Sequence, residues 1–489
     1  MKKYDAVIIG SGISGLTAAL ILGQYGKRVA LLEQFSNIAP LLRRFKRTDI
    51  WCDPGFHYTG GLGSGGTLSV LLKCLGVFDE IEPIPLSPEG FDIISVNGEK
   101  EYSMPYGYDR LAEYLCSRFP ASSAAIGIYI NALIKINNET AFTNLDLDLD
   151  QFSVSVYENQ SLKEFLTHAG AESELISLLG NHGYVLYGSP ADEVPMPVHA
   201  YIMGSFYKSS HTVQNGGDAF VKAFEKALRN YNIDILTNCK VQKIEINQKR
   251  AVEGIRTEDE QYIECDTCIC TIHPKQLLKL LPASGVRPAY INRIRNLENT
   301  TGSLVVFIDS DYYPEKLQKT NFYRFNEKNN NQEDRDYLAC MAAHPDTEPK
   351  GRRSLTIIKP AKVETYKDFF GESYFKNYDS YTNLKREETD KLFNEFLNIF
   401  PEMKSHARIV DSATPVTYNR YTRTDMGAMY GTKQSVYKRP LSSRSSVHGL
   451  YLAGQSLQLG VMGAIVSGFV ATTHLIDQKV LREQIRKCH

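Results

Sequence analysis

The stretch DAVIIGSGISGLTAALILGQYGKRVALLE, from Asp5 to Glu33, decides the fold of this chain. It opens with a short apolar, β-branched run, DAVII, which predicts a buried parallel strand. A glycine turn, GSGISG from Gly10 to Gly15, leads into the helical run LTAALILGQYG. A second apolar strand, RVALLE, ends on the acid Glu33. Strand, glycine turn, helix, strand and acid in one compact unit predict a Rossmann-type, dinucleotide-binding α/β domain.

The residues of this unit have separate mechanical tasks. Gly10 permits the tight turn, Gly12 lets the backbone approach a pyrophosphate, and Gly15 lets the helix pack against the strand. The N-terminus of the helix offers free N–H groups and a positive dipole end to the phosphates. Glu33 can hold both hydroxyls of an adenosine ribose, and its charge disfavours a 2′-phosphate. The unit therefore predicts FAD or NAD rather than NADP, against the alternative of an ordinary α/β loop.

A second glycine-rich run, GFHYTGGLGSGG from Gly55 to Gly66, also contains the spacing G-x-G-x-x-G. No apolar strand leads directly into Gly61, and no acid closes a second strand–helix–strand unit behind it. A second nucleotide site is therefore disfavoured. Two interpretations remain open: a turn that caps the following helical run, TLSVLLKCLG, and a loop beside the ligand of the first turn.

Length and composition bound the class of protein. The chain has 489 residues, enough for two or three domains with a large core. A net charge of −1 offers no electrostatic footprint for nucleic acid, so no nucleic-acid partner is expected. Scattered cysteines and the absence of a secretory signal indicate a reducing, cytoplasmic location. Glycines interrupt the late apolar stretch from Leu457 to Ile476, which predicts a buried helix rather than a membrane span.

Two segments resemble metal sites but lack the required pattern. CDTCIC, from Cys265 to Cys270, has a strand pattern that a closed four-ligand zinc site would have to break. LDLDLDQ, from Leu145, starts like a calcium loop, but Gln151 and Tyr157 stand where the loop requires glycine and glutamate. No metal ion is predicted.

The C-terminal region carries a second dense pattern. HGLYLAGQSLQLGVMGAIVSGFVATTHLI, from His448, predicts a strand, a loop and a helix that begins near Val461. The N-terminus of that helix would point its dipole at a bound group. Upstream, TPVTYNRYTRTDMGAMYG places Tyr418, Tyr421 and Tyr430 beside glycines, which predicts the wall of a shaped cavity.

These motifs together resemble the phytoene desaturase-like family of FAD-dependent oxidoreductases, and most of all its branch of retinol saturases and carotenoid isomerases. The resemblance rests on GSGISGLTAA with LLE, GFHYTGG, NGGDAFVKAF, VQKIEI, TPVTYNRY with GAMYG, and YLAGQSLQLGVMGAIVSG. It implies a glutathione reductase- or amine oxidase-like α/β FAD-binding domain with an inserted α+β substrate domain. The implied segments are 1–85, 204–285 and 405–489 for the FAD-binding domain, and 86–203 and 286–404 for the substrate domain.

The resemblance also implies the residues that bind FAD. Those for the pyrophosphate and the adenosine would be Gly10, Ser11, Gly12, Ser14, Gly15, Glu33 and Val241, with Arg43 or Arg44 neutralising phosphate or lying in a solvated loop. Those for the ribityl chain and the flavin would be Gly454, Gln455, Met462, Gly463 and Ala464. Two features depart from the family pattern. Gln455 stands where many relatives have an acid, and NIAPLLRRF replaces a paired glycine.

By the same resemblance, GFHYTGG lies beside the flavin and the substrate, so His57 and Tyr58 are the candidate catalytic residues. Adding hydrogen across a C=C bond needs a hydride and a proton, and one of these side chains would donate or relay the proton. A structural histidine bonded to backbone is the alternative for His57.

The implied reaction is saturation of a double bond in an apolar polyene of the retinoid or carotenoid kind. The alternatives are a redox-neutral cis–trans isomerase that uses reduced flavin, a desaturase, an amine oxidase on the same fold, and a non-catalytic lipid-carrying flavoprotein. Without a second nucleotide fingerprint, electrons would come from a separate donor. Because such a substrate resides in a bilayer, AAIGIYINALIKI, from Ala124, would dock peripherally on a membrane through a face that includes Ile130; a packed helix is the alternative.

Overall fold

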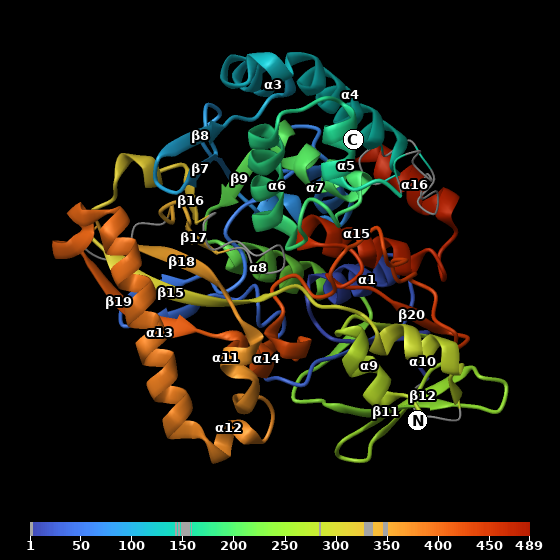
Figure 1. Ribbon diagram of the computed structural model, residues 1–489. Helices are drawn as coiled ribbons and strands as arrows, with labels where there is room; N and C mark the ends of the chain where they lie inside the picture. Colours follow the sequence, from blue (N-terminus) through green and yellow to red (C-terminus); the bar gives the residue numbers. More distant parts are fainter. Residues whose placement is uncertain are drawn as a thin grey trace.

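The computed structural model describes residues 3–141, 144, 147, 157, 159–282, 285–326, 336–345 and 351–489 (Figure 1). The segment 145–151, which starts like a calcium loop, lies outside these residues except for residue 147.

A five-stranded parallel sheet forms the first layer of the fold. In spatial order its strands are β10 (Ile233–Leu236), β2 (Val29–Leu32), β1 (Ala6–Ile9), β14 (Cys268–Cys270) and β20 (Leu450–Leu452). Every neighbouring pair runs parallel; Ile8, for example, lies between Leu31 and Ile269. β1, β2 and β14 are buried throughout because both faces of the sheet are covered, which explains their unbroken apolar sequence. The predicted strand–turn–helix–strand unit is confirmed.

Three helices cover one face of this sheet: α1 (Ile13–Gln24), α8 (Gly217–Leu228) and α15 (Gly460–Thr472). Nearly all of α1 and α15 is buried. Gly468 brings the two helices so close that an added Cβ would lie 2.8 Å from the carbonyl oxygen of Ser14. The predicted late apolar helix is therefore part of the core. Across the described ranges, no helix combines the length and apolar character that crossing a membrane requires.

The other face carries a small antiparallel sheet of β11 (Val241–Ile246), β12 (Val252–Thr257) and β13 (Tyr262–Glu264). Val7 of β1 packs in one cluster with Ile244 of β11 and Cys268 of β14. Helices α9 (Pro274–Leu280) and α10 (Pro288–Arg295) follow. The ring Nδ1 of His273 accepts a hydrogen bond of 3.3 Å from the backbone N–H of Lys275 and so caps α9.

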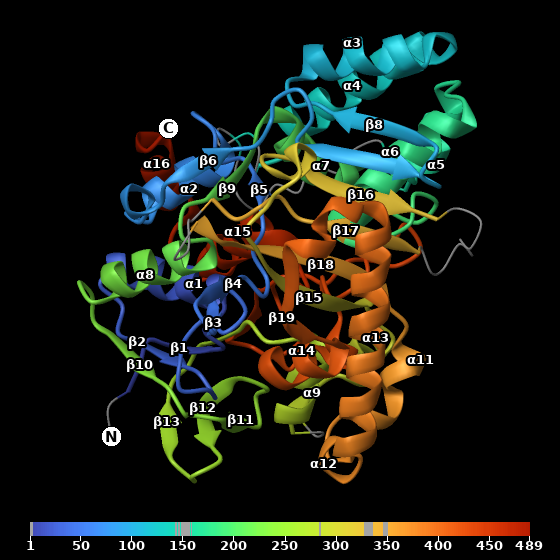
Figure 2. The same cartoon turned by 90° about the vertical axis from the view of Figure 1, so that its left-hand side faces the viewer.

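A seven-stranded sheet forms the second part of the molecule and runs from the centre to the upper right in Figure 2. Its order is β19 (Ala407–Ala413), β15 (Gly302–Ser310), β18 (Arg353–Ala361), β17 (Tyr337–Cys340), β16 (Asn321–Phe325), β7 (Asp92–Val96) and β8 (Lys100–Met104). Only the pair β16 and β7 is parallel among these described strands. Helix α13 (Tyr378–Ile399) packs on one face through Leu392 and Phe396.

Four helices gather near β7 and β8 at the top of both views: α3 (Tyr108–Arg118), α4 (Ser123–Glu139), α6 (Ser173–Tyr187) and α7 (Met196–Lys208) (Figures 1 and 2). Other elements are α2 (Thr67–Cys74), α5 (Leu162–His168), α11 (Val363–Tyr366), α12 (Ser373–Lys376), α14 (Pro415–Thr422), α16 (Gln478–Lys487), β3 (Phe45–Arg47), β4 (Ile50–Cys52), β5 (Thr59–Gly60), β6 (Pro83–Pro85) and β9 (Ser210–Val213).

The chain passes between the two large sheets several times. The strands of the parallel sheet come from segments 1–85, 204–285 and 405–489. Those of the seven-stranded sheet come from 86–203 and 286–404, except β19, which begins at Ala407 and pairs with β15. The exact domain boundaries stay a prediction.

Candidate functional site

The glycine turn between β1 and α1 forms a cradle. An added Cβ on Gly10, whose φ is +99°, would lie 2.7 Å from the hydroxyl of Thr271, and one on Gly15 would lie 2.1 Å from the carbonyl oxygen of Gly10. A Cβ on Gly12, in contrast, would meet no described atom within 4 Å. The first turn of α1 is buried, and among the described side chains none caps it. A buried helix end of this kind is suited to an anionic ligand that accepts from its N–H groups.

Glu33 and Ser11 hold this cradle together. Oε2 of Glu33 accepts hydrogen bonds from the hydroxyl of Ser11 and from its backbone N–H, the latter at 3.2 Å. The backbone N–H of Cys239 donates to the carbonyl oxygen of Glu33 at 2.8 Å, which brings Val241, two residues further on, to the same end of β2. The residues predicted to hold the adenosine half of the cofactor are thus neighbours in space. Their contacts with a ligand stay predictions.

A second helix N-terminus, that of α15, lies beside the cradle. In the part of the chain that the structure describes, no side chain caps α15, and Met462, Gly463 and Ala464 are buried in its first turns. The N–H of Gly454 donates to the hydroxyl of Ser467 at 2.8 Å, and that hydroxyl lies 3.3 Å from the hydroxyl of Ser14. Gln455 next to it is half-buried. Sequence reasoning missed Ser467 and Thr271, although Ser467 stands four residues after Gly463, on the same side of the helix.

Both arginines considered for phosphate are paired with carboxylates of α8. The guanidinium of Arg43 lies 2.7 Å from Glu225. The buried side chain of Arg44 lies 3.5 Å from Asp218, whose other oxygen accepts from the backbone N–H of Arg44. These ion pairs fasten the loop before β3 to α8. A phosphate contact by Arg43 stays a prediction.

A cavity of about 140 Å³ adjoins the N-terminus of α15. Its wall includes Leu459, Gly460, Val461 and Met462 from α15 and its approach, Gly55 to Thr59 from the second glycine run, and Tyr201, Phe206, Tyr323, Tyr337, Met341 and Tyr430. An added Cβ on Gly61 would lie 3.2 Å from the sulfur of Met462. The second glycine run therefore packs against α15, and the run TLSVLLKC after it forms α2. Of the two interpretations left open by the sequence, the geometry favours a loop beside the site of the first turn.

His57 and Tyr58 both line this cavity. Burial lowers the pKa of His57 to about 4, an effect that the charge of Asp53 partly offsets. Its imidazole is therefore neutral at physiological pH. The hydroxyl of Tyr58 donates to Oδ2 of Asp92 at 2.8 Å and lies 2.8 Å from the hydroxyl of Tyr323. Burial and the nearby charge of Asp92 raise the pKa of Tyr58 well above its ordinary value, so the phenol stays protonated.

The three tyrosines predicted to form a cavity wall lie in different surroundings. Tyr430 lines the cavity, and its hydroxyl donates to the carbonyl oxygen of Val185 at 2.7 Å. Tyr418 donates to the carbonyl oxygen of Pro54 at 2.9 Å and so supports the loop that carries His57. The prediction for Tyr421 is wrong: its side chain is 55% exposed, because it lies on the solvent side of α14.

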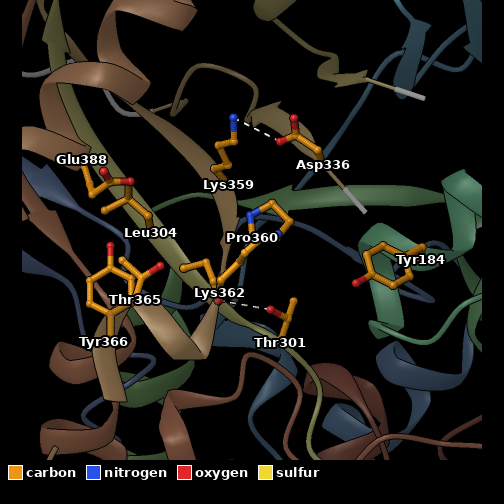
Figure 3. A pocket seen from close by; sticks show the side chains of 11 residues that line it. Tyr184, Thr301, Leu304, Asp336, Lys359, Pro360, Lys362, Thr365, Tyr366 and Glu388 are labelled. Atoms are coloured by element: carbon orange, nitrogen blue, oxygen red, sulfur yellow. Dashed lines mark hydrogen bonds and ion pairs between the residues drawn. The ribbon is translucent and has the colours of Figure 1, made fainter. Parts of the chain in front are cut away.

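A larger cavity, of about 420 Å³, lies beside β18 of the seven-stranded sheet (Figure 3). It borders the face of the sheet opposite to the face that borders the first cavity. Lys359 of β18 lines it, whereas the preceding Ile358 lines the first cavity, because successive strand residues point to opposite faces. Tyr184 lines the larger cavity and meets the ring of Tyr337 edge-on at 6.2 Å. The ammonium of Lys359 is paired with Asp336 at 3.1 Å and with Glu395. No motif of the sequence indicated this cavity.

Nearly the whole chain is similar to known proteins. The profile of the flavin containing amine oxidoreductases matches residues 13–476. The all-trans-retinol 13,14-reductase of Macaca fascicularis is 24% identical over 530 residues, which span 98% of this chain and 86% of that protein. The chloroplastic prolycopene isomerase of Daucus carota is 22% identical over 520 residues, which span 99% and 81%. A solved oxidoreductase from Methanosarcina mazei has a TM-score of 0.65 at 16% identity and covers 95% of this chain and 98% of its own.

The Rossmann-type sheet, the glycine cradle and the two uncapped helix ends define a flavin-binding oxidoreductase fold. The fold class predicted from the sequence is confirmed. The chain belongs to the flavin containing amine oxidoreductase family, and it is an FAD-dependent oxidoreductase. The open space at Gly12 and the buried, uncapped start of α1 fit the pyrophosphate of FAD. The predicted similarity to retinol reductases and carotenoid isomerases is confirmed as well.

Proposed function

We propose that this protein saturates one C=C bond of an apolar polyene, of the retinoid or carotenoid kind, by adding a hydride and a proton. The observation that carries the proposal is the cavity beside the N-terminus of α15, where His57 and Tyr58 meet a wall of aromatic and aliphatic side chains. Such a wall suits an apolar substrate. The similarity to an all-trans-retinol 13,14-reductase supports the choice of substrate class.

FAD in its reduced form supplies the hydride when it is bound. The turn residues Gly10, Ser11, Gly12, Ser14 and Gly15 would hold its pyrophosphate, with Glu33 and Val241 toward the adenosine. Gly454, Gln455, Met462, Gly463 and Ala464 would hold the other half. The positive end of the α15 dipole would stabilise negative charge on the reduced ring. The aromatic walls of the cavity would exclude water, which keeps the hydride from being lost to solvent.

We infer that the proton comes from His57 or Tyr58, two of the polar side chains that line the cavity. His57 is neutral at physiological pH and so offers at most a weakly acidic N–H. Tyr58 keeps its proton over the whole physiological range. We assign delivery of the proton to Tyr58 and orientation of the substrate to His57. His57→Gln should then mainly raise KM, whereas Tyr58→Phe should lower kcat, by about 100-fold or more.

The product mass tests this function. The purified, flavin-loaded protein would be reduced without oxygen and given retinol and a panel of carotenoids. A gain of two hydrogens is the expected result. A product of unchanged mass but shifted chromatographic retention would replace saturation with isomerisation.

Redox-neutral cis–trans isomerisation is the second candidate, because a prolycopene isomerase matches nearly the whole chain. Three further alternatives have simple tests. A desaturase would remove two hydrogens from its substrate, an amine oxidase would bleach its flavin rapidly with amines, and a non-catalytic flavoprotein would keep a flavin that no donor reduces.

We further propose a separate electron donor and a peripheral contact with membranes. Helix α4 presents Ile128 and Ile134 to solvent, 49% and 36% exposed, on the side that also carries Lys135. Two exposed isoleucines beside a lysine suit the surface of an anionic bilayer. Ile130, expected on this face, is instead 7% exposed and packs inward, so that part of the sequence prediction is wrong.

A further inference from the structure

A chain of buried hydrogen bonds leads from the cavity into the protein through Asp92, the first residue of β7. The side chain of Asp92 has no exposed surface. Its Oδ2 accepts from Tyr58 at 2.8 Å and contacts Nε2 of His182 at 2.9 Å. Its Oδ1 accepts from the side-chain amide of Asn321 at 2.8 Å. A single carboxylate oxygen thus joins a phenol of the cavity wall to an imidazole that is itself completely buried.

The direction of these hydrogen bonds restricts what Tyr58 can do. An ionised carboxylate has no hydrogen, so the hydroxyl of Tyr58 points its hydrogen at Asp92 and away from the cavity. Tyr58 can then only accept from Tyr323. One added proton on the pair of Asp92 and His182 changes this arrangement, because a carboxyl group can donate to the Tyr58 oxygen. The hydrogen of Tyr58 is then free to turn into the cavity.

We propose that Asp92 and His182 are positioning residues that hold, as a pair, the proton that Tyr58 delivers to the substrate. The inference rests on the proposed function. Reduced FAD, when bound, would supply the hydride for the C–H bond at one carbon of the double bond. The O–H bond of Tyr58 breaks as a C–H bond forms at the other carbon. The proton held by the pair moves to the Tyr58 oxygen, so no phenolate accumulates, and the pair later regains a proton from water.

The other titratable groups around this chain of hydrogen bonds do not hold the proton in place of Asp92 and His182. Nδ1 of His182 lies 3.1 Å from the hydroxyl of Tyr207, and beyond it Tyr129 and His199 are hydrogen-bonded to each other. Burial lowers the pKa of His199 to about 3, so that imidazole stays neutral. The remaining titratable groups facing Tyr58 or Asp92 are His57 on the neighbouring loop position, Tyr323 and Tyr337 of the strands, and Tyr430. Among the imidazoles named here, only His182 shares a carboxylate oxygen with a phenol of the cavity wall.

Single-turnover kinetics test the proposal. Flavin-loaded wild type and D92N would be reduced and then mixed with retinol in the absence of oxygen. The rate of flavin reoxidation would be measured over a range of pH. We expect the wild-type rate to decline at alkaline pH, and D92N to react about 100-fold more slowly and without that decline. D309N is the matched control, since Asp309 is an equally buried carboxylate on the same sheet that pairs with Arg352 and Arg408. A D92N protein with the wild-type rate and pH profile would overturn the proposal.

A second measurement needs no turnover. In protein labelled with 3-fluorotyrosine, the ¹⁹F resonance that disappears in Tyr58→Phe belongs to Tyr58. We expect it to ionise at a clearly lower pH in D92N than in the wild type or D309N, because a neighbouring negative charge is gone. An unchanged midpoint in D92N would contradict the coupling of Tyr58 to Asp92. If the wild type converts no polyene but the midpoint moves, the proposed function fails while the hydrogen-bonded chain stands.

Discussion

The hydroxyl of Ser467, in the middle of α15, accepts a hydrogen bond of 2.8 Å from the backbone N–H of Gly454, two residues after the end of β20. Gly454 has a φ of +115°, and an added Cβ would lie 2.8 Å from the carbonyl oxygen of Thr271, so its backbone is fixed from two sides. The bond orients the loop that leads to the N-terminus of α15. Ser467 thus links the parallel sheet to α15, whose N-terminus adjoins the cavity lined by His57 and Tyr58.

We expect Ser467→Ala to lower both stability and flavin content. The variant leaves the buried N–H of Gly454 without its acceptor, which costs about 1–3 kcal/mol. Thr472→Ala is the control, because its hydroxyl lies in the same helix and donates only to the carbonyl oxygen of Phe469. Thermal unfolding and the ratio of FAD to protein would be measured for both. Equal effects of the two substitutions would argue against a special role for Ser467.

Two alanine substitutions in the glycine turn should separate folding from cofactor binding. Gly12→Ala places its methyl group where no described atom lies within 4 Å, at a φ of −59° that alanine adopts freely. Gly15→Ala drives its methyl group to 2.1 Å from the Gly10 carbonyl oxygen, which costs about 1–3 kcal/mol or more. We expect G12A to keep the unfolding temperature of the flavin-free protein but to lose FAD, and G15A to unfold at a lower temperature. G12A that retains FAD would show that the pyrophosphate lies elsewhere.

The sequence predicted the parts of the fold whose signal is local. The apolar runs of β1 and β2, the turn between them and the unbroken apolar helix α15 each carry their own pattern. The residues around Tyr58 do not. Asp92 lies 34 positions from Tyr58 in the sequence, and His182 lies 90 positions from Asp92. A lone aspartate before an apolar strand has no pattern that indicates burial, so only the pairing of β7 with β16 and the packing of α6 reveal the chain of hydrogen bonds.

The errors have an equally physical cause. In α4, apolar residues occur on both the inward and the outward side of the helix, so periodicity alone cannot tell that Ile130 packs inside while Ile128 faces solvent. In α14, a run dense in tyrosine predicts a wall, but Tyr421 lies in the last turn of the helix, where its side chain is exposed, while Tyr418 one turn earlier reaches the carbonyl oxygen of Pro54.

The exposed isoleucines of α4 give a prediction about membranes. Ile128→Glu should weaken binding to vesicles that contain anionic lipid, because it replaces the most exposed apolar side chain of the helix with a repelled charge. Its unfolding temperature should stay near that of the wild type. Ile130→Glu, by contrast, buries a charge and should destabilise the fold severely. Sedimentation with vesicles measures the first effect, and undiminished sedimentation of I128E would exclude docking through α4.

Three imidazoles whose pKa is lowered predict how stability depends on pH. Burial is the largest cause that lowers the pKa of His57 and His273 to about 4 and that of His199 to about 3, from an ordinary value of 6.5. Below pH 6.5 these imidazoles take up protons in the unfolded chain but stay neutral in the folded chain. Their contribution to the free energy of unfolding therefore has its full value above pH 6.5 and falls as the pH drops toward 4. Each unit of pKa shift corresponds to about 1.4 kcal/mol per group at the acid limit.

His273→Asn isolates one of these groups. Asparagine can still cap α9 in place of the imidazole that accepts from Lys275, but it does not titrate. Urea unfolding of wild type and H273N would be compared at several pH values between 7 and 4. We expect the stability of H273N to fall less steeply with acid, while above pH 6.5 both proteins respond to pH alike. If the stabilities of the two proteins fell in parallel over the whole acid range, His273 would take up its proton as readily in the folded protein as in the unfolded chain. That result would contradict the lowered pKa of His273.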